Sequence, residues 1–425
     1  MNIAEMKKNI KDIDFKTLYC VGGGDEERYI KRFYGLLDGF GENFGKDGDI
    51  RLFSAPGRTE IGGNHTDHQH GAVVAGSLNL DVIGAVRPNG ENIIRIKSEG
   101  FPMDTVSLDS LEATSEEYGK SSGLIRGIAA CFLKKGYKVG GFDAYTTSNV
   151  LKGSGMSSSA AFEILVAVII NGLFANGEVS AVEMAKFGQY AENVYFGKPC
   201  GLLDQTACAS GGIVAMDFAD NENPDIEKLD FDFAKTGYSL CIIDSGADHA
   251  NLTDEYAAIT VEMKKVAEYF GKSVLNEVSA EEFFKEIKNV REAVKNDRAI
   301  LRAIHFFNET NRAKYEADAI KKGDFDEFLR LVGESGRSSY MYLQNVFAAS
   351  KPKNQAVSLA LALCDELLKG KGAFRVHGGG FAGTIQAFVP SDMLDGFKTG
   401  IEAVLGEGMC HILSIRSVGG IEIKL

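Results

Sequence analysis

Residues 152–160 of the chain read Lys152-Gly153-Ser154-Gly155-Met156-Ser157-Ser158-Ser159-Ala160, and a strongly apolar helix is predicted to follow, from about Ser157 to Leu173. Glycines let the backbone approach a ligand closely, and the free N–H groups at the start of a helix favour a bound anion. Serine hydroxyls can donate to a phosphate or bind Mg²⁺. The pattern differs from the Walker A sequence. Two interpretations therefore stand: a phosphate-binding loop, or a capped helix with a flexible lead-in.

A second polar segment lies upstream, at residues 55–68, and reads APGRTEIGGNHTDH. It gathers a cation, acids, an amide and imidazoles into one turn-rich stretch. Such groups can bind several hydroxyls of a sugar, with Asp67 accepting and Asn64 or His65 donating. One alternative is a solvated turn. The other is a metal site made by the cluster of Asp67, His65, His68 and His70, although no distant Cys or His set completes it.

Two further segments contain several glycines. Residues 376–383 read VHGGGFAG, and residues 197–205 read GKPCGLLDQ, with Glu192 just before them. The four glycines of the first segment indicate backbone that passes close to a ligand or to another strand. A tight structural turn is the alternative for the first segment. A helix cap is the alternative for the acid Asp204 in the second.

Taken in their order along the chain, the four segments resemble the signatures of the GHMP kinases, and of the galactokinases in particular. The corresponding family patterns are GRxNxIGEHTDY at 57–68, PxGxGLSSSA at 151–160, GxPCGxxDQ at 197–205 and GGGFGG at 378–383. The resemblance extends from about residue 50 to 390. It implies an α+β fold of two domains with the active site between them. Residues 1–218 would form a ribosomal protein S5 domain 2-like unit with the sugar signature and phosphate loop, and residues 219–425 a ferredoxin-like unit with the glycine-rich motif.

The resemblance also implies a sugar 1-kinase that uses ATP and Mg²⁺ to phosphorylate the anomeric hydroxyl of a galactose-type sugar. The implied catalytic residues are Asp204 and Arg58. The implied sugar contacts are Asn64, His65, Asp67, Gly201 and Tyr256. The implied ATP-binding residues are Gly153, Ser154, Gly155, Ser157, Ser158 and Ser159, with Ser159 and Glu192 holding Mg²⁺. We therefore expect the turn near Gly155 and the carboxylate of Asp204 to face one another.

The chain departs from the family pattern at several positions. Asn64 replaces a glutamate that accepts the C6 hydroxyl of the sugar, and an uncharged amide would tolerate a C6 carboxylate that glutamate would repel. Glu60 replaces an asparagine, His68 a tyrosine, and Leu151 a proline, and Asp248 takes the place of an arginine. Galactose is the first choice of substrate. Galacturonate, arabinose and a galactosamine derivative stay open, as does a catalytically silent sugar sensor outside the kinases.

Composition limits the class of protein. The chain has 425 residues and a formal net charge of −13, and an acidic surface repels nucleic acid and anionic membranes. Its longest apolar stretch, Ile164–Phe174, is shorter than the ~20 residues that span a bilayer. Seven cysteines without a CxxC pair fit reduced thiols in a cytoplasm. Composition therefore indicates a cytoplasmic soluble enzyme or binding protein. The resemblance implies that its partners are a sugar and ATP, and we expect a monomer or weak homodimer.

Hydrophobic patterning predicts mixed strands and helices without regular βαβ alternation, which favours α+β layers. Strands are expected over 50–53, 73–86 and 238–243, with a turn at 88–90. The acidic stretch 217–236 is expected to be a domain boundary or a surface hairpin near one. Helices are expected over 124–135, 253–270, 280–295, 310–321, 324–335 and 354–369. A strand pair is expected over 412–423, around Gly419-Gly420.

Overall fold

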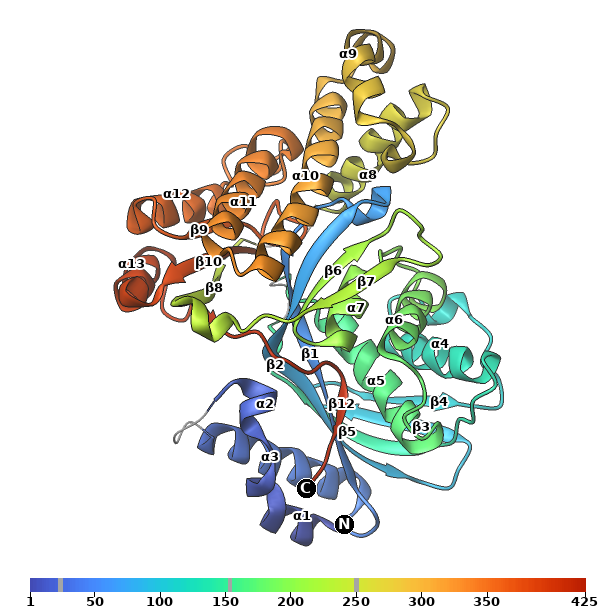
Figure 1. Ribbon diagram of the computed structural model, residues 1–425. Helices are drawn as coiled ribbons and strands as arrows, with labels where there is room; N and C mark the ends of the chain where they lie inside the picture. The colour runs from blue at the N-terminus through green and yellow to red at the C-terminus, as the bar shows by residue number, and fades with distance from the viewer. Residues whose placement is uncertain (22–25, 152–154, 248–251) are drawn as a thin grey trace.

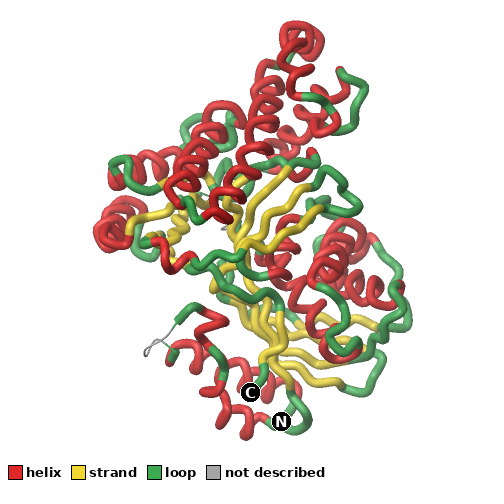
Figure 2. The backbone as a smooth tube through the Cα atoms, in the orientation of Figure 1, coloured by secondary structure: helices red, strands yellow, loops and turns green. Residues whose placement is uncertain are grey.

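The computed structural model describes residues 1–21, 26–151, 155–247 and 252–425. Within them the strands form two sheets (Figures 1 and 2). The large sheet has the order β12-β1-β2-β5-β3-β4, and β6 and β7 extend it from β2. Its strands are β1 Arg51–Gly62, β2 Ala72–Pro88, β3 Ile93–Ser98, β4 Met103–Ser107, β5 Phe142–Ser148, β6 Ile213–Asp217, β7 Asp225–Leu229 and β12 Ile421–Ile423.

The long antiparallel pair β1 and β2 forms the centre of the large sheet. Their register shifts between Pro56 and Arg58 and again between Glu60 and Gly62. Bulges of this kind bend a strand and re-aim its side chains. Both register shifts lie in the part of β1 that belongs to the polar segment 55–68. The bends that they make in the strand therefore determine where the side chains of Arg58 and Glu60 point.

Helices cover both faces of the large sheet (Figure 1). One face carries α1 Ile3–Asn9, α2 Phe15–Tyr19 and α3 Glu27–Phe44, and the other carries α4 Ser121–Lys134, α5 Ser158–Phe174, α6 Ala181–Tyr190 and α7 Leu203–Ser210. Along β2, Ile83 and Ala85 pack with α3 while Val82 and Val86 pack in the core that contains α5, as the period of two in a strand requires. The predicted helices over 124–135 and 157–173 are confirmed as α4 and α5.

The small sheet has the order β11-β8-β10-β9. Its strands are β8 Tyr238–Asp244, β9 Ala373–Val376, β10 Thr384–Pro390 and β11 Cys410–Leu413, and the helices α12 Ala356–Leu368 and α13 Leu394–Leu405 precede β9 and β11. This is the β-α-β-β-α-β order of a ferredoxin-like unit. The strand predicted over 238–243 and the helix over 354–369 are confirmed.

The described residues between β8 and α12 form four α-helices: α8 Thr253–Tyr269, α9 Ala280–Val294, α10 Asp297–Lys322 and α11 Phe325–Ser338. Three of them match the predicted ranges. The predicted range 310–321 is only the second half of α10, because the side chain of Asn296 accepts from the N–H of Ala299 and caps the helix much earlier.

The predicted strand pair over 412–423 is wrong. β11 pairs with β8 in the small sheet, whereas β12 pairs with β1 in the large sheet. Gly419 and Gly420, which lie between these strands, do not form a hairpin turn. They allow the chain to pass close to neighbouring segments. A Cβ added to Gly419 would lie 2.0 Å from the carbonyl oxygen of Ala209, and one on Gly420 would lie 2.6 Å from Ile164.

The acidic stretch after residue 217 is a surface hairpin, as expected, in which β6 pairs with β7. Both β7 and β12 lie beyond residue 218 in the chain but belong to the large sheet. Of the helices in the described ranges, none has the length and apolar character needed to cross a membrane.

Candidate active site

Asp204 lies in the first turn of α7 and binds two groups that come from distant parts of the chain. Its Oδ1 accepts from Arg58 Nε at 2.8 Å, and its Oδ2 accepts from the hydroxyl of Ser157. Arg58 also donates to the carbonyl of Gly155. The carboxylate is 37% exposed while the arginine side chain is 7% exposed. Arg58 and Ser157 therefore hold the Asp204 carboxylate in place, while part of it stays accessible to solvent.

Ser157 precedes α5 with a left-handed backbone, at φ 54°. This conformation is uncommon for a residue other than glycine. The serine side chain makes no capping bond to its own helix and instead reaches Asp204. The expectation that the serine-glycine turn and Asp204 face one another is confirmed. Gly153 and Ser154 lie outside the described residues.

Burial opposes the positive charge of Arg58, but the carboxylates of Asp204 and Glu60 together raise its pKa above the usual value. The guanidinium therefore stays charged at any pH at which the protein is folded. This fixed cation lies directly against the carboxylate of Asp204.

Asp67 lies in the short turn η2, Asp67–Gln69, close to the backbone of Gly201. A Cβ added to Gly201 would lie 2.1 Å from Asp67 Oδ2. Burial raises the pKa of Asp67 to about 6, and the charges of Asp204 and Glu60 act in the same direction. The structure thus brings Asp67, Gly201 and Asp204 together, as the sequence predicted.

His65 and Tyr256 both reach the glycine-rich segment. His65 Nε2 lies 3.0 Å from the carbonyl oxygen of Gly379, and the Tyr256 hydroxyl donates to the carbonyl of Gly380 at 2.9 Å. Burial lowers the pKa of His65. The neutral imidazole must therefore carry its proton on Nε2, because a carbonyl can only accept.

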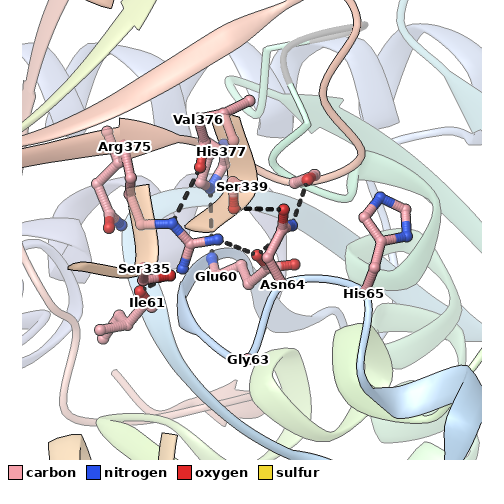
Figure 3. Close-up of polar contacts among 12 residues, drawn as sticks. Glu60, Ile61, Gly63, Asn64, His65, Ser335, Ser339, Arg375, Val376 and His377 are labelled. Atoms are coloured by element: carbon pink, nitrogen blue, oxygen red, sulfur yellow. Dashed lines mark hydrogen bonds and ion pairs between the residues drawn. The ribbon is translucent and has the colours of Figure 1, made fainter. Parts of the chain in front are cut away.

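The side chain of Asn64 is fully buried and fully hydrogen-bonded (Figure 3). Its amide nitrogen donates to Glu60 Oε1 and to the carbonyl of Gly378, both at 2.8 Å. Its amide oxygen accepts from Ser339 at 3.2 Å and from Asn345 at 2.9 Å. An amide has two donors and two acceptor positions. The sugar contact predicted for Asn64 would therefore require one of these bonds to break, and the geometry favours a positioning role instead.

Arg375 joins β9 to β1 from the centre of the same cluster (Figure 3). Its guanidinium, with no exposed surface, binds Glu60 Oε1 at 2.8 Å, the carbonyl of Ile61 at 2.6 Å and that of Val376 at 3.1 Å. Removing one partner of such a buried ion pair strongly destabilises the folded protein. The pair fixes the bulged end of β1 against the small sheet.

Glu192 lies in a π-helical turn, η4 Ala191–Phe196, that extends α6. Its Oε1 accepts from Lys198 at 3.2 Å and its Oε2 from Gln205 at 2.9 Å. The same Gln205 nitrogen donates to Glu163 on α5 at 2.9 Å. Glu163 Oε1 and Gln205 Oε1 are buried and have no hydrogen-bond partner among the described residues. Oxygen atoms therefore predominate around Glu192.

Several residues of the site were not predicted from the sequence: Arg375, Glu163, Ser339, Asn345 and His305, whose Nε2 binds the backbone carbonyl of Asn64 at 2.8 Å. A charged residue in the otherwise apolar strand β9 was the available signal for Arg375. The metal-site alternative for the histidine cluster gains no support, because no three His, Cys, Asp or Glu side chains in the described ranges are placed to share an ion.

Known proteins match the chain over most of its length. A family model for the galactokinase galactose-binding signature matches residues 38–88, and one for the GHMP kinases N terminal domain matches residues 123–212. The galactokinase of Clostridium tetani is 30% identical over 361 residues, which cover 83% of this chain and 87% of that protein. The galactokinase of Glaesserella parasuis is 29% identical, with 84% and 90% covered.

Solved structures agree. The structure of Lactococcus lactis galactokinase complexed with galactose superposes with a TM-score of 0.77 at 25% identity, covering 92% of this chain and 99% of that one. A mevalonate kinase from L. major, 13% identical with a TM-score of 0.57, shares the fold. The predicted α+β GHMP kinase fold is thus confirmed. By its sequence, its fold and the order of its motifs, the chain belongs to the galactokinase family of the GHMP kinases.

Proposed function

We propose that this protein transfers the γ-phosphate of ATP to the anomeric hydroxyl of a galactose-type sugar. The observation that carries the proposal is the contact of Asp204 with both Arg58 and Ser157. This contact brings the start of α5, which follows the predicted phosphate-binding turn, next to a carboxylate that lies beside the predicted sugar-binding segment 55–68. Membership of the galactokinase family supports the same reaction and implies ATP as the phosphate donor.

The sugar is proposed to lie between Asp204 and the residues His65, Asp67 and Tyr256, with its hydroxyls against their polar atoms. Gly201 supports this placement, because its missing side chain is what allows the Asp67 carboxylate to lie so close. We assign Asn64 to positioning instead of direct contact, since its amide is saturated by protein partners.

The phosphates of ATP are proposed to lie at the start of α5, against Gly155 and the serines at 157–159. The N-terminus of a long buried helix supplies N–H groups and a positive dipole end. Gly153 and Ser154, which the sequence also assigns to ATP, lie outside the described residues.

Ser159 and Glu192 are proposed to hold Mg²⁺. The donor set fits this ion, because Mg²⁺ takes oxygen ligands and usually binds one or two carboxylates together with substrate phosphates. The buried oxygen atoms of Glu163 and Gln205 that lack a partner add to the acceptor character of this region. When bound, the ion would neutralise negative charge on the phosphates.

In the proposed reaction the anomeric oxygen attacks the γ-phosphorus in line, the bond to the β-phosphate oxygen breaks, and ADP leaves. Asp204 either takes the proton of the attacking hydroxyl or, held ionised by Arg58, stabilises it electrostatically. In both cases Arg58 and Ser157 keep the carboxylate in one orientation before the sugar arrives, so no reorganisation is needed during the reaction.

A coupled ADP-release assay tests the proposal, with galactose, galacturonate, arabinose, galactosamine and N-acetylgalactosamine as acceptors. We expect galactose to give the highest kcat/KM and Asp204→Asn to abolish most of the signal. Sugar binding without ADP release would favour a silent sensor. ADP release with a different sugar as the best acceptor would keep the kinase and replace its substrate.

Three further features belong to the proposal. A cytoplasmic location accords with the seven cysteines, all of which are free thiols. A monomer or weak homodimer is proposed for the assembly. A boundary near residue 218 is proposed between the two domains, with β7 and β12 returning to the first.

A further inference from the structure

The glycine-rich segment presents three consecutive carbonyl groups to the proposed sugar site. The carbonyls of residues 378, 379 and 380 accept hydrogen bonds from Asn64, His65 and Tyr256, at 2.8, 3.0 and 2.9 Å. Each donor is one of the side chains that the sequence assigns to the sugar. One short stretch of backbone therefore bonds to three of the assigned sugar contacts.

This backbone is held firmly in place. Gly378 and Gly380 have left-handed φ angles of 63° and 79°, which glycine adopts without the strain of a side chain. The carbonyl of Gly379 also accepts from Asn345 at 3.2 Å. On the Asn64 side, the buried pair of Arg375 and Glu60 anchors the strand from which the sugar loop begins (Figure 3).

These bonds determine which hydrogen-bonding capacity is left for a substrate. A carbonyl only accepts, so it commits the proton of each of its donors. The neutral imidazole of His65, with its proton on Nε2, keeps a lone pair on Nδ1. The phenolic hydroxyl of Tyr256 gives its proton to Gly380 and so does not donate to a sugar. The Asp67 carboxylate accepts, and the Asn64 amide is saturated.

Building on the proposed function, we infer that the carbonyls of residues 378–380 fix the polarity of the sugar site by consuming its donors. Of these four side chains, His65 and Asp67 then offer acceptors, and neither Asn64 nor Tyr256 offers a donor. The site takes a neutral sugar whose hydroxyls donate, and it discriminates against a sugar that carries a carboxylate there. A carboxylate would bring further acceptors and a negative charge to face Asp67.

Sugar analogues test this polarity directly. Fluorine at a hydroxyl position cannot donate, and a deoxy position can neither donate nor accept. We expect 2-, 3-, 4- or 6-substituted galactose to lose affinity by about 10-fold at each contacted hydroxyl, equally for the deoxy and the fluoro sugar, as measured by isothermal titration calorimetry. A fluoro sugar that binds like galactose, where the deoxy sugar does not, would show a donating site and overturn the inference.

The imidazole is tested by two variants that differ in polarity. His65→Gln keeps an N–H for the Gly379 carbonyl and an oxygen acceptor, whereas His65→Leu keeps neither. Circular dichroism verifies that both fold. We expect H65Q to retain at least about 5-fold more galactose affinity than H65L; equal affinities would refute the acceptor role of His65.

Galacturonate separates this inference from the proposed function. If galactose supports no ADP release, the proposed function fails. If galactose is phosphorylated but galacturonate has an equal kcat/KM, the function stands and the inference about polarity fails. We expect galacturonate to be at least about 100-fold poorer than galactose, since a buried acceptor would face its charge without a donor.

Discussion

Replacing Gly201 by alanine would test the placement of Asp67 with a single methyl group. Gly201 precedes α7, and its φ lies outside the left-handed region, so alanine adopts the same backbone. The added Cβ would lie 2.1 Å from Asp67 Oδ2. Real contacts to a Cβ are not closer than 3.0 Å, so the two groups must separate by about 0.9 Å, which is 3.0 minus 2.1.

A displacement of this size falls on the group proposed to accept a sugar hydroxyl. A misplacement of about 1 Å can cost ~10²-fold in rate or affinity. We expect Gly201→Ala to lower kcat/KM for galactose by about 100-fold, chiefly through KM, while KM for ATP stays within about twofold. Steady-state kinetics with each substrate varied in turn would measure both constants.

Gly333 provides a matched control. It lies in the middle of α11, and a Cβ added there meets nothing within 4 Å. Gly333→Ala should leave the kinetics unchanged and raise the free energy of unfolding by up to ~1 kcal/mol, because alanine favours a helix more than glycine does. A galactose KM in G201A equal to that of the unmodified enzyme would refute the role of Asp67. A matching rise in the KM for ATP would instead indicate that α7 itself had moved.

Three further predictions follow from the same contacts. Asp204→Asn should lower kcat by roughly 10²–10⁴-fold with ATP binding retained, and near-normal turnover would remove Asp204 from the chemistry. Arg375→Met leaves the Glu60 carboxylate buried without its cation, so the free energy of unfolding should fall by about 3–5 kcal/mol, as measured in urea by circular dichroism. Arg330→Met, at an exposed ion-paired arginine, should lower it by less than ~1 kcal/mol. Equal losses in the two variants would contradict a special role for the buried pair. Galactose affinity should rise as the pH increases through about 6, because burial raises the pKa of Asp67 to about 6 and the carboxyl becomes a pure acceptor once it has lost its proton. Asp67→Asn should flatten this pH profile. If the profile is unchanged in that variant, another group causes the pH dependence.

The local parts of the site were predictable from the sequence, because each motif sets its own backbone. A glycine-rich turn before a strongly apolar run predicts a helix start with free N–H groups, and α5 begins at Ser158 as expected. The meeting of Ser157 with Asp204 followed from the order of the motifs. No single pattern predicted it, since each had a plausible structural alternative.

The long-range parts were not predictable in the same way. β12 pairs with β1, far away in the sequence, and nothing in its three residues favours that partner over the nearer β11. Arg375 illustrates the same limit. In the sequence it is one charged residue in a short apolar strand, and its partners Glu60 and Ile61 lie more than 300 positions earlier. Its burial is decided by how the two sheets pack.

The departures at positions 60 and 64 are best considered as one change. Taken separately, Asn64 in place of a glutamate suggested an altered sugar contact, and Glu60 in place of an asparagine had no explanation. In the structure the two side chains bond to each other at 2.8 Å, and Glu60 also binds Arg375. The buried cation needs one nearby carboxylate, and an amide beside it completes the hydrogen bonding. Because its amide is saturated by protein partners, Asn64 gives little reason to look beyond galactose. We propose that the choice of sugar depends instead on His65, Asp67 and the carbonyl groups of the glycine-rich segment.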